Sequence, residues 1–314
     1  MATTGLRIGR RLRIRDLEVF FAVVECGSMA KAAAQLGVTQ PSVSETVASL
    51  ESAFGVRLLD RSSQGVAPTM YGHALLKRGV AALDELKQGL RDISYLADPK
   101  VGEVRVGWPE SFTEVLSGMV RAFCLEHPGI ALRIDHLPAP TSALPELHAR
   151  KLDVALARSL PEPFGSDMNV EVLFDDPAVV AAGANSRWSR KRRIELADLV
   201  DADWVATPRE TLTTRLLEQA FHDKGLPAPK LRVTTFSVQL RARLLVQGEF
   251  LACMPRSLLQ VKVDGVGLRT LPIKLAPHTF PVAIVTVKNR TLTPVVELFV
   301  ERLRAFVKSG AARC

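Results

Sequence analysis

The sequence predicts a multidomain protein of mixed α+β and α/β class, with a winged helix-turn-helix head, one long helix and an α/β body. Short helical patterns separated by glycine turns fill the first 69 residues, and one unbroken helical pattern follows to about residue 97. From about residue 101, apolar strand-like runs alternate with amphipathic helical runs, which is typical of βαβ units and a parallel sheet.

The head is predicted to hold three short helices, the first covering residues 17–25. Ser28 and Thr39 stand where a side-chain oxygen caps the second and third helices, and Gly37 stands where a left-handed turn ends the second. Pro41 fits the first turn of the third helix, because a missing N–H costs little there. Two short helices joined by a glycine-containing turn are an arrangement that lays the second helix in a DNA groove.

The third helix, which runs to about Phe54, has one apolar face and one polar face. Its polar face carries small groups that can approach base edges, namely Gln40, Ser42, Glu45, Thr46 and Ser49. Residues 57–61 and 66–68 then read as a strand–turn–strand wing. The head therefore predicts a nucleic-acid reader.

The long helix, residues 70–97, carries an apolar stripe at helical spacing formed by Leu76, Val80, Leu83, Leu86, Leu90 and Ile93. At ~1.5 Å per residue such a helix spans about 40 Å, which is long for a lone surface helix. The stripe favours antiparallel dimerisation, and packing on its own domain is the alternative.

The body is predicted to alternate strands with helices. The expected strands are 104–108, 130–137, 152–157, 179–182, 204–206, 231–234, 250–254 and 281–287. The expected helices are 115–125, 145–150, 211–224, 237–247 and 294–307. A two-unit βαβ arrangement with a parallel sheet follows from this order.

A ligand site is expected beyond the carboxyl ends of the strands, as in other open α/β sheets. The candidate residues there are Trp108, Ser111, Thr141, Arg158, Thr207, Pro208 and Ser237. Arg158 is the best partner for a carboxylate, although a surface arginine at a strand end is the alternative. Ser111 with Glu114 also forms a capping-box pattern, and Trp108 also fits a strand-end core position. Glu110 argues against a strongly anionic ligand unless its side chain turns outward.

Composition suits a polyanionic partner without proving one, because the net charge of +8 and pI near 9.6 are spread over the chain. The cysteines, Cys26, Cys124, Cys253 and Cys314, are too far apart for a zinc site and fit reduced thiols. We expect no metal, no cofactor and no catalytic residues, since no such constellation occurs. The basic run 190–193 predicts a solvated loop, with a second DNA contact or partner site as the alternative.

Export and membrane insertion are not expected. The apolar run 19–24 is too short for a signal sequence and acidic residues flank it, and no run reaches the ~18 apolar residues of a membrane helix. A cytoplasmic protein is therefore predicted.

The head resembles the LysR-type transcriptional regulators. The residues that carry the resemblance are Leu17–Phe20, Gly27–Ser28, Ala32–Ala33, Leu36, Val38–Ser44, Leu50–Glu51, Phe54–Val56, Leu58, Arg61, Thr69 and Gly72. The body adds the looser matches 101–107, 127–130 and 151–155, although the stretch 247–251 lacks a second glycine that the family often has.

The resemblance implies a basic extension (1–15), a winged helix-turn-helix DNA-binding domain (16–69), a linker and dimerisation helix (70–97) and an effector-binding domain (101–308). The last resembles periplasmic solute-binding proteins, with lobe 1 at about 101–175 and 281–308 and lobe 2 at about 176–280. The implied partners are double-stranded promoter DNA, a small-molecule effector, further copies in a homodimer or homotetramer, and RNA polymerase.

The expected DNA-binding residues are Ser28, Lys31, Thr39, Gln40, Pro41, Ser42, Ser44, Glu45, Arg57, Arg61 and Thr69. Glu45 departs from the family, which often has Arg after this serine; a glutamate cannot hold a phosphate but accepts from a cytosine amino group. Phosphate anchoring then falls to Lys31, Arg57, Arg61 and Thr69. The arginines of the basic extension, Arg7, Arg10, Arg11, Arg13 and Arg15, either add contacts or form a frayed terminus.

Three alternatives stay open. The helical head could be an assembly module of a small-molecule binding protein, the body could be an α/β enzyme without a recognisable constellation, and Cys124 with Cys253 could sense redox state as cysteine pairs do in some members of this family.

Overall fold

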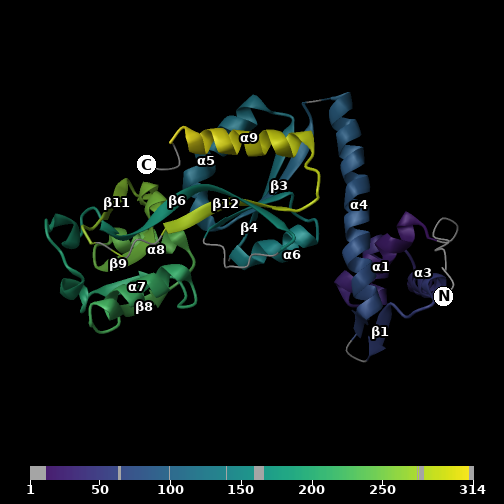
Figure 1. Cartoon of the computed structure of the whole chain (residues 1–314), viewed down its shortest axis with the longest axis horizontal. Helices are drawn as coiled ribbons and strands as arrows, with labels where there is room; N and C mark the ends of the chain where they lie inside the picture. The colour runs from purple at the N-terminus through teal and green to yellow at the C-terminus, as the bar shows by residue number, and fades with distance from the viewer. Residues whose placement is uncertain are drawn as a thin grey trace. The chain divides into compact units, whose positions relative to one another are not determined.

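The computed structural model describes residues 12–62, 65–98, 100–138, 140–158, 166–273, 275 and 279–310. The chain divides into two compact units, one ending at Arg91 and the other beginning at Asp92 (Figure 1). Four residues named in the sequence analysis, Arg7, Arg10, Arg11 and Cys314, lie outside the described residues.

The first unit contains the predicted helices and wing. Its elements are α1 (Ile14–Cys26), α2 (Met29–Leu36), α3 (Gln40–Phe54), β1 (Leu59–Ser62), β2 (Gly65–Pro68) and most of α4 (Met70–Ala97). The core of the three short helices includes Phe20, Val23, Val43 and Val47, all without exposed area. Burial of such side chains is worth roughly 1.5–3 kcal/mol each, which holds these short helices together.

Local capping confirms the predicted boundaries of α2 and α3. Ser28 Oγ accepts the Lys31 amide at 3.5 Å, and Thr39 Oγ1 accepts the Ser42 amide at 3.4 Å. Gly37 ends α2 at φ 66°, a conformation that other residues adopt only with strain.

The second unit contains β3 to β12, with strands in the order β4-β3-β5-β12-β6-β9-β7-β8 and a β10–β11 hairpin beside β6. The strands are β3 (Gly102–Trp108), β4 (Ile130–His136), β5 (Val154–Arg158), β6 (Met168–Gly183), β7 (Asp203–Ala206), β8 (Lys230–Thr234), β9 (Phe250–Pro255), β10 (Lys262–Val263), β11 (Val266–Thr270) and β12 (Thr279–Val287). The helices are α5 (Thr113–Glu126), α6 (Ala143–His148), α7 (Leu212–Asp223), α8 (Val238–Val246) and α9 (Pro294–Lys308). Short 3-10 turns lie at η2 (Glu110–Phe112), η3 (Pro140–Ser142), η4 (Trp188–Arg190), η5 (Leu196–Leu199) and η6 (Arg256–Gln260).

Two lobes share this series of strands. Lobe 1 has β3, β4, β5, β12 and the first part of β6, with α5, α6 and α9; lobe 2 has the end of β6, β7 to β11, α7 and α8. Strand β6 runs through both, since residues up to Pro177 pair with β12 and residues from Ala178 pair with β9.

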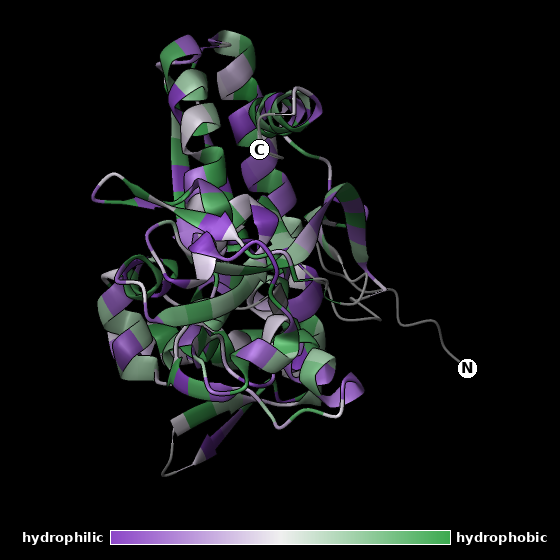
Figure 2. Cartoon of the chain, turned by 90° about the vertical axis from the view of Figure 1, so that its left-hand side faces the viewer, coloured by the Kyte–Doolittle hydropathy of each residue, from purple (hydrophilic) through white to green (hydrophobic). Residues whose placement is uncertain are grey.

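Each lobe is a sheet covered by helices on both faces, because alternate side chains of a strand point to opposite sides. In β5, Val154 and Leu156 join one core with α5 and α9, whereas Ala155 and Ala157 join another with α6. In β9, Leu251 and Cys253 pack in one core with α7, whereas Ala252 and Met254 pack in another core with α8. The helices are banded in hydrophobic and hydrophilic residues, as this packing requires (Figure 2).

Three sequence expectations for the body needed correction. The sheet is parallel only in part, since β6 and β12 run antiparallel to their neighbours. Strand β6 begins at Met168 rather than near residue 179, because pairing with β12 sustains a half whose side chains are mostly exposed. Ser111 does not cap α5, because it lies inside η2 and the helix begins after Phe112.

A buried ionic cluster fixes β5 against the rest of lobe 1. Asp153, 4% exposed, accepts from Arg105 Nη2 at 2.6 Å and from Arg290 Nη2 at 2.9 Å, and Arg290 Nη1 also donates to the Leu152 carbonyl at 2.8 Å. Burial raises the pKa of Asp153, but the hydrogen bonds and charges of the two arginines outweigh it and hold that pKa below its ordinary value.

We expect Gly72→Ala to destabilise the first unit by about 2 kcal/mol, because a Cβ there would lie 2.1 Å from the Leu58 carbonyl oxygen. Gly89→Ala, on the same helix, is the control, since a Cβ there meets nothing within 4 Å. The control should stabilise slightly, by about 1 kcal/mol, through helix propensity. Thermal unfolding of both variants checks this, and equal melting temperatures would contradict the close approach.

Replacing Asp153 with Asn should destabilise lobe 1 by about 3 kcal/mol at neutral pH, because two arginines lose their buried partner. A carboxylate with a lowered pKa stabilises the fold above the pKa of the unfolded chain, ordinarily 3.8, and that stability is lost as pH falls through the folded-state value. The gap between Asp153→Asn and wild type should therefore be constant from pH 7 to 5 and shrink below 3.8. Urea unfolding across this range measures it; a gap that stays constant at lower pH would show that the charge is not the cause.

Candidate nucleic-acid interface and inter-lobe site

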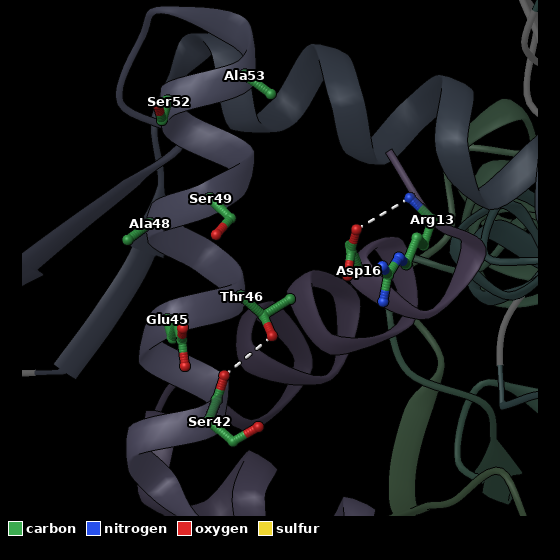
Figure 3. Close-up of a pocket in the computed structure, with 9 residues that line it drawn as sticks. All are labelled: Arg13, Asp16, Ser42, Glu45, Thr46, Ala48, Ser49, Ser52 and Ala53. Carbon is green, nitrogen blue, oxygen red and sulfur yellow. Dashed lines mark hydrogen bonds between the residues drawn. The ribbon is translucent and has the colours of Figure 1, made fainter. Parts of the chain in front are cut away.

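The outer face of α3 is exposed and polar. Together with the start of α1 it forms a shallow hollow lined by Arg13, Asp16, Ser42, Glu45, Thr46, Ala48, Ser49, Ser52 and Ala53 (Figure 3). Thr46 Oγ1 donates to the Ser42 carbonyl at 2.9 Å, so this hydroxyl is engaged within the helix. The exposed Ser42, Glu45 and Ser49 present short side chains to a partner.

Exposed cationic side chains lie in this hollow and elsewhere in the first unit. Arg13 lines the hollow itself. Lys31 on α2 is exposed, and Arg57 and Arg61 are exposed in and before the wing. Gln40 is exposed at the start of α3, next to Pro41, and Ser44 is half-buried. Exposed cations together with small polar groups match an interface that holds phosphates and reads bases.

Glu51 ties the wing to α3. Its Oε1 accepts from the Leu58 amide at 2.8 Å and from the Leu59 amide at 3.1 Å, at the start of β1. A charged acceptor shared by two backbone donors makes strong hydrogen bonds. The carboxylate of a helix residue therefore sets the position of the wing.

Thr69 is used internally. Its Oγ1 donates to the Arg57 carbonyl at 2.8 Å and accepts from the Gly72 amide at 3.1 Å. The hydroxyl that was predicted to meet a phosphate thus joins the wing to the start of α4. Ser28 and Thr39 are likewise engaged as helix caps.

In the second unit, a buried polar cluster lies where β6 passes between the lobes. Arg158, at the end of β5, pairs with Asp176 in β6, and Asp176 also accepts from Ser257 in η6 through Oγ at 2.6 Å and the amide at 3.1 Å. Burial lowers the pKa of Arg158 and the Asp176 carboxylate opposes that effect. Arg158 also stacks over Phe112, 4.8 Å from the ring centre. This arginine, predicted to meet a ligand carboxylate, meets a carboxylate of its own chain.

The loop after β3 crosses to the other lobe. Glu110 Oε2 accepts from the Val238 amide at the start of α8, at 3.0 Å, and Ser237 caps the same helix by accepting the Leu240 amide at 3.2 Å. The loop that holds Ser111 and the helix start that holds Ser237, two predicted ligand residues, are therefore neighbours. Arg241, 4% exposed, lies one turn further along α8 and is attracted to Glu110.

The remaining predicted ligand residues lie in different surroundings. Thr207 Oγ1 lies 2.6 Å from Thr211 Oγ1 and 3.1 Å from Thr214 Oγ1, so these hydroxyls form a network after β7. The Pro208 carbonyl accepts from Thr211 Oγ1 at 2.7 Å. Trp108 packs in the lobe 1 core, which fits the strand-end core alternative, and the exposed Thr141 lies in η3.

The cysteines of the described residues are free thiols in different surroundings. Cys124 is exposed on α5, whereas Cys253 is buried on β9. Burial raises the pKa of Cys253 to about 12, and Arg241 only partly opposes it. Because the thiolate is the reactive form, the surroundings of Cys253 disfavour redox chemistry.

Sequence reasoning missed Asp176, Ser257 and Arg241. Arg241 carried a usable signal, because it falls on the inner face of α8 with Val238, Ala242 and Leu245, where a charge needs a partner. Asp176 and Ser257 carried none, since only the folded chain brings them to Arg158.

Among the described residues, no group of three or more His, Cys, Asp or Glu side chains could hold a metal ion. In the same ranges no helix is long and apolar enough to cross a membrane.

Both parts of the chain match known sequence families. Residues 14–73 match "Bacterial regulatory helix-turn-helix protein, lysR family", and residues 97–308 match "LysR substrate binding domain". Over 306 residues the chain is 28% identical to HTH-type transcriptional regulator TdcA of Escherichia coli, covering 96% of this chain and 95% of TdcA. It is 25% identical over 300 residues to HTH-type transcriptional regulator GbpR of Azospirillum brasilense, covering 94% of this chain and 86% of GbpR.

Solved structures show the same fold. Full-length CbnR in complex with its target DNA superposes with a TM-score of 0.63 at 22% identity, covering 94% of this chain and 100% of CbnR. A full-length OxyR variant from Pseudomonas aeruginosa superposes with a TM-score of 0.65 at 20% identity, covering 95% of each chain.

Proposed function

The chain belongs to the LysR family of transcriptional regulators, and on that premise we propose which of its surfaces bind promoter DNA, an effector and a second copy of the chain. It is a DNA-binding transcriptional regulator with an effector-binding domain and is not an enzyme. LysR regulators bind DNA and effectors and form oligomers.

The outer face of α3 reads base edges in a major groove. The observation that carries this proposal is the exposed row Gln40, Ser42, Glu45 and Ser49 on one helix, with the exposed cations Arg13, Lys31, Arg57 and Arg61 in the same unit. Lys31, Arg57 and Arg61 hold phosphates, and Glu51 keeps the wing in place beside α3. Two such heads in one oligomer enter successive major grooves of an interrupted palindrome, about 34 Å apart.

An effector binds between the two lobes, where η2 of lobe 1 meets the start of α8 in lobe 2. We assign to this site Ser111 in η2, Ser237 at the start of α8, Arg158 at the end of β5 and Thr207 after β7. Effector binding changes the balance between oligomer geometries, because a ligand acts only by preferring one state. RNA polymerase is a further candidate partner, and the cytoplasm is the proposed location.

The carboxyl-terminal half of α4 provides the dimer contact. Leu90 is 66% exposed and Ile93 is 65% exposed, and neighbouring Leu86 continues the stripe at helical spacing. Leu76 lies on the other part of the stripe and packs against the core of its own unit, so the predicted surface divides in two. An exposed apolar stripe of this kind is stabilised by a second helix.

Titration of the protein against its own upstream intergenic DNA, with competitor DNA present, tests the proposed DNA binding. A competitor-resistant complex supports it. If neither this DNA nor a randomised library gave a preferred site, the helical head would be better explained as an assembly module.

Glu45→Arg should strengthen non-specific binding and change the preferred base at one position, because a cation replaces an acceptor at the centre of α3. The salt dependence of binding, as log K against log salt, should steepen by about 0.9. Selection from a randomised library, followed by titration at several salt concentrations, measures both effects.

Arg61→Ala is the contrasting variant and should weaken binding to all DNA sequences alike, with a shallower salt slope. Glu85→Arg, the same charge change on α4, is the control; an unchanged base preference in Glu45→Arg would contradict base reading by this residue.

Leu90→Glu should convert dimers to monomers and weaken operator binding about 100-fold, because two linked heads bind more tightly than one. Sedimentation and DNA titration measure the two effects together. Lys77→Glu, at an exposed position of α4 on the side of the helix away from Leu86 and Leu90, makes a larger change of charge and should leave the dimer intact. Dimers that survive in Leu90→Glu would place the contact elsewhere.

A further inference from the structure

A carboxylate of lobe 1 accepts a backbone hydrogen bond at the start of α8, in lobe 2. Ser237 caps the helix from its own chain segment, through the Leu240 amide, while Glu110 of lobe 1 accepts the Val238 amide at 3.0 Å. Amides at a helix start need acceptors, and the helix dipole favours an anion there. Glu110 therefore fills a place that is electrostatically suited to a carboxylate.

Arg241 adds a buried positive charge beside the start of α8. Its side chain is 4% exposed, and its Nε is buried with no hydrogen-bond partner among the described residues. Burial lowers the pKa of this arginine to about 10, and the nearby Glu110 acts in the opposite direction. A buried guanidinium is costly unless an anion lies close to it. The need for a negative group is therefore built into α8.

Of Glu110 and Arg241, Glu110 is the residue that can move away from the start of α8. It lies half-buried in the short turn η2, which follows the end of β3. Arg241 belongs to the inner face of α8, where Val238, Ala242 and Leu245 are buried in the lobe 2 core. If Glu110 withdrew, the Val238 amide and the Arg241 charge would remain together without their acceptor.

We propose that the effector presents a carboxylate that replaces Glu110 at the Val238 amide beside Arg241. Glu110 is thus an internal competitor that occupies the site when no effector is bound. This inference rests on the proposed binding of an effector between the lobes. Because one place cannot hold both carboxylates, effector binding breaks the Glu110 contact between the lobes and so favours a different lobe arrangement.

Acetate is the simplest probe, since it carries the same functional group as the Glu110 side chain. Glu110→Ala should bind sodium acetate saturably and at least about tenfold more tightly than wild type. In wild type, acetate must first displace the Glu110 side chain, which lowers its apparent affinity. Melting temperature against acetate concentration measures this in the full chain, with sodium chloride at equal ionic strength as reference. Glu110→Gln, whose amide oxygen still accepts the Val238 amide, should respond less than Glu110→Ala.

Glu114→Ala is the matched control, because Glu114 is an exposed glutamate on the next turn of the same segment. It should behave as wild type. Glu110→Ala with Arg241→Met should lose the acetate response; if that variant does not fold, Glu110→Ala with Arg241→Lys should keep a weakened one. An equal acetate response in wild type, Glu110→Ala and Glu114→Ala, or none in any of them, would overturn the inference.

Operator binding by Glu110→Ala, measured without acetate, separates this inference from the proposed function. A variant that binds DNA but gains no acetate binding contradicts the inference alone. A wild-type protein without specific DNA binding contradicts the proposed function, whatever acetate does.

Discussion

Arg158 and Asp176 pair in the interior of the second unit, at the point where β6 leaves one lobe and enters the other. Taking both charges out of water costs several kcal/mol each. The Asp176 carboxylate offsets part of this cost by accepting from the Ser257 hydroxyl and amide, whereas Arg158 Nε is buried without a hydrogen-bond partner among the described residues. The cluster joins the end of β5, the middle of β6 and the turn after β9. The two lobes are therefore held at a common polar point, and rearrangement between them occurs around it.

The contacts between the lobes differ in how readily they open. Arg158 and Asp176 are almost fully buried and belong to strands, so their separation exposes unpaired charges to a dry interior. Glu110 reaches α8 from a half-buried turn and can find water as it leaves. A buried pivot beside a releasable contact would let the effector-binding domain take a second arrangement, which regulation by a small molecule requires.

The first unit could be predicted almost completely from the sequence, because its boundaries are set locally: Ser28, Thr39 and Gly37 act within one turn of their own position. The body was less predictable where pairing decides structure. The first half of β6 leaves Val170 and Val172 exposed beside polar side chains, and its backbone pairs with β12, which comes more than a hundred residues later in the chain. The β10–β11 hairpin did carry a signal, the Asp264–Gly265 turn, with φ of 51° and 79°. Arg158 was identified from its place after a strand, whereas its partner Asp176 could be found only in the folded chain.

The single carboxylate of Glu51, shared between the amides of Leu58 and Leu59, has a mechanical consequence. Because α3 and the wing are joined through it, any adjustment of one relative to the other, on a duplex whose grooves vary in width, would break these two hydrogen bonds. The head therefore resists deformation. Where the groove width does not match the spacing of α3 and the wing, deformation of the DNA provides part of the fit. Operators would then be distinguished partly by the bending stiffness of base steps that no side chain touches.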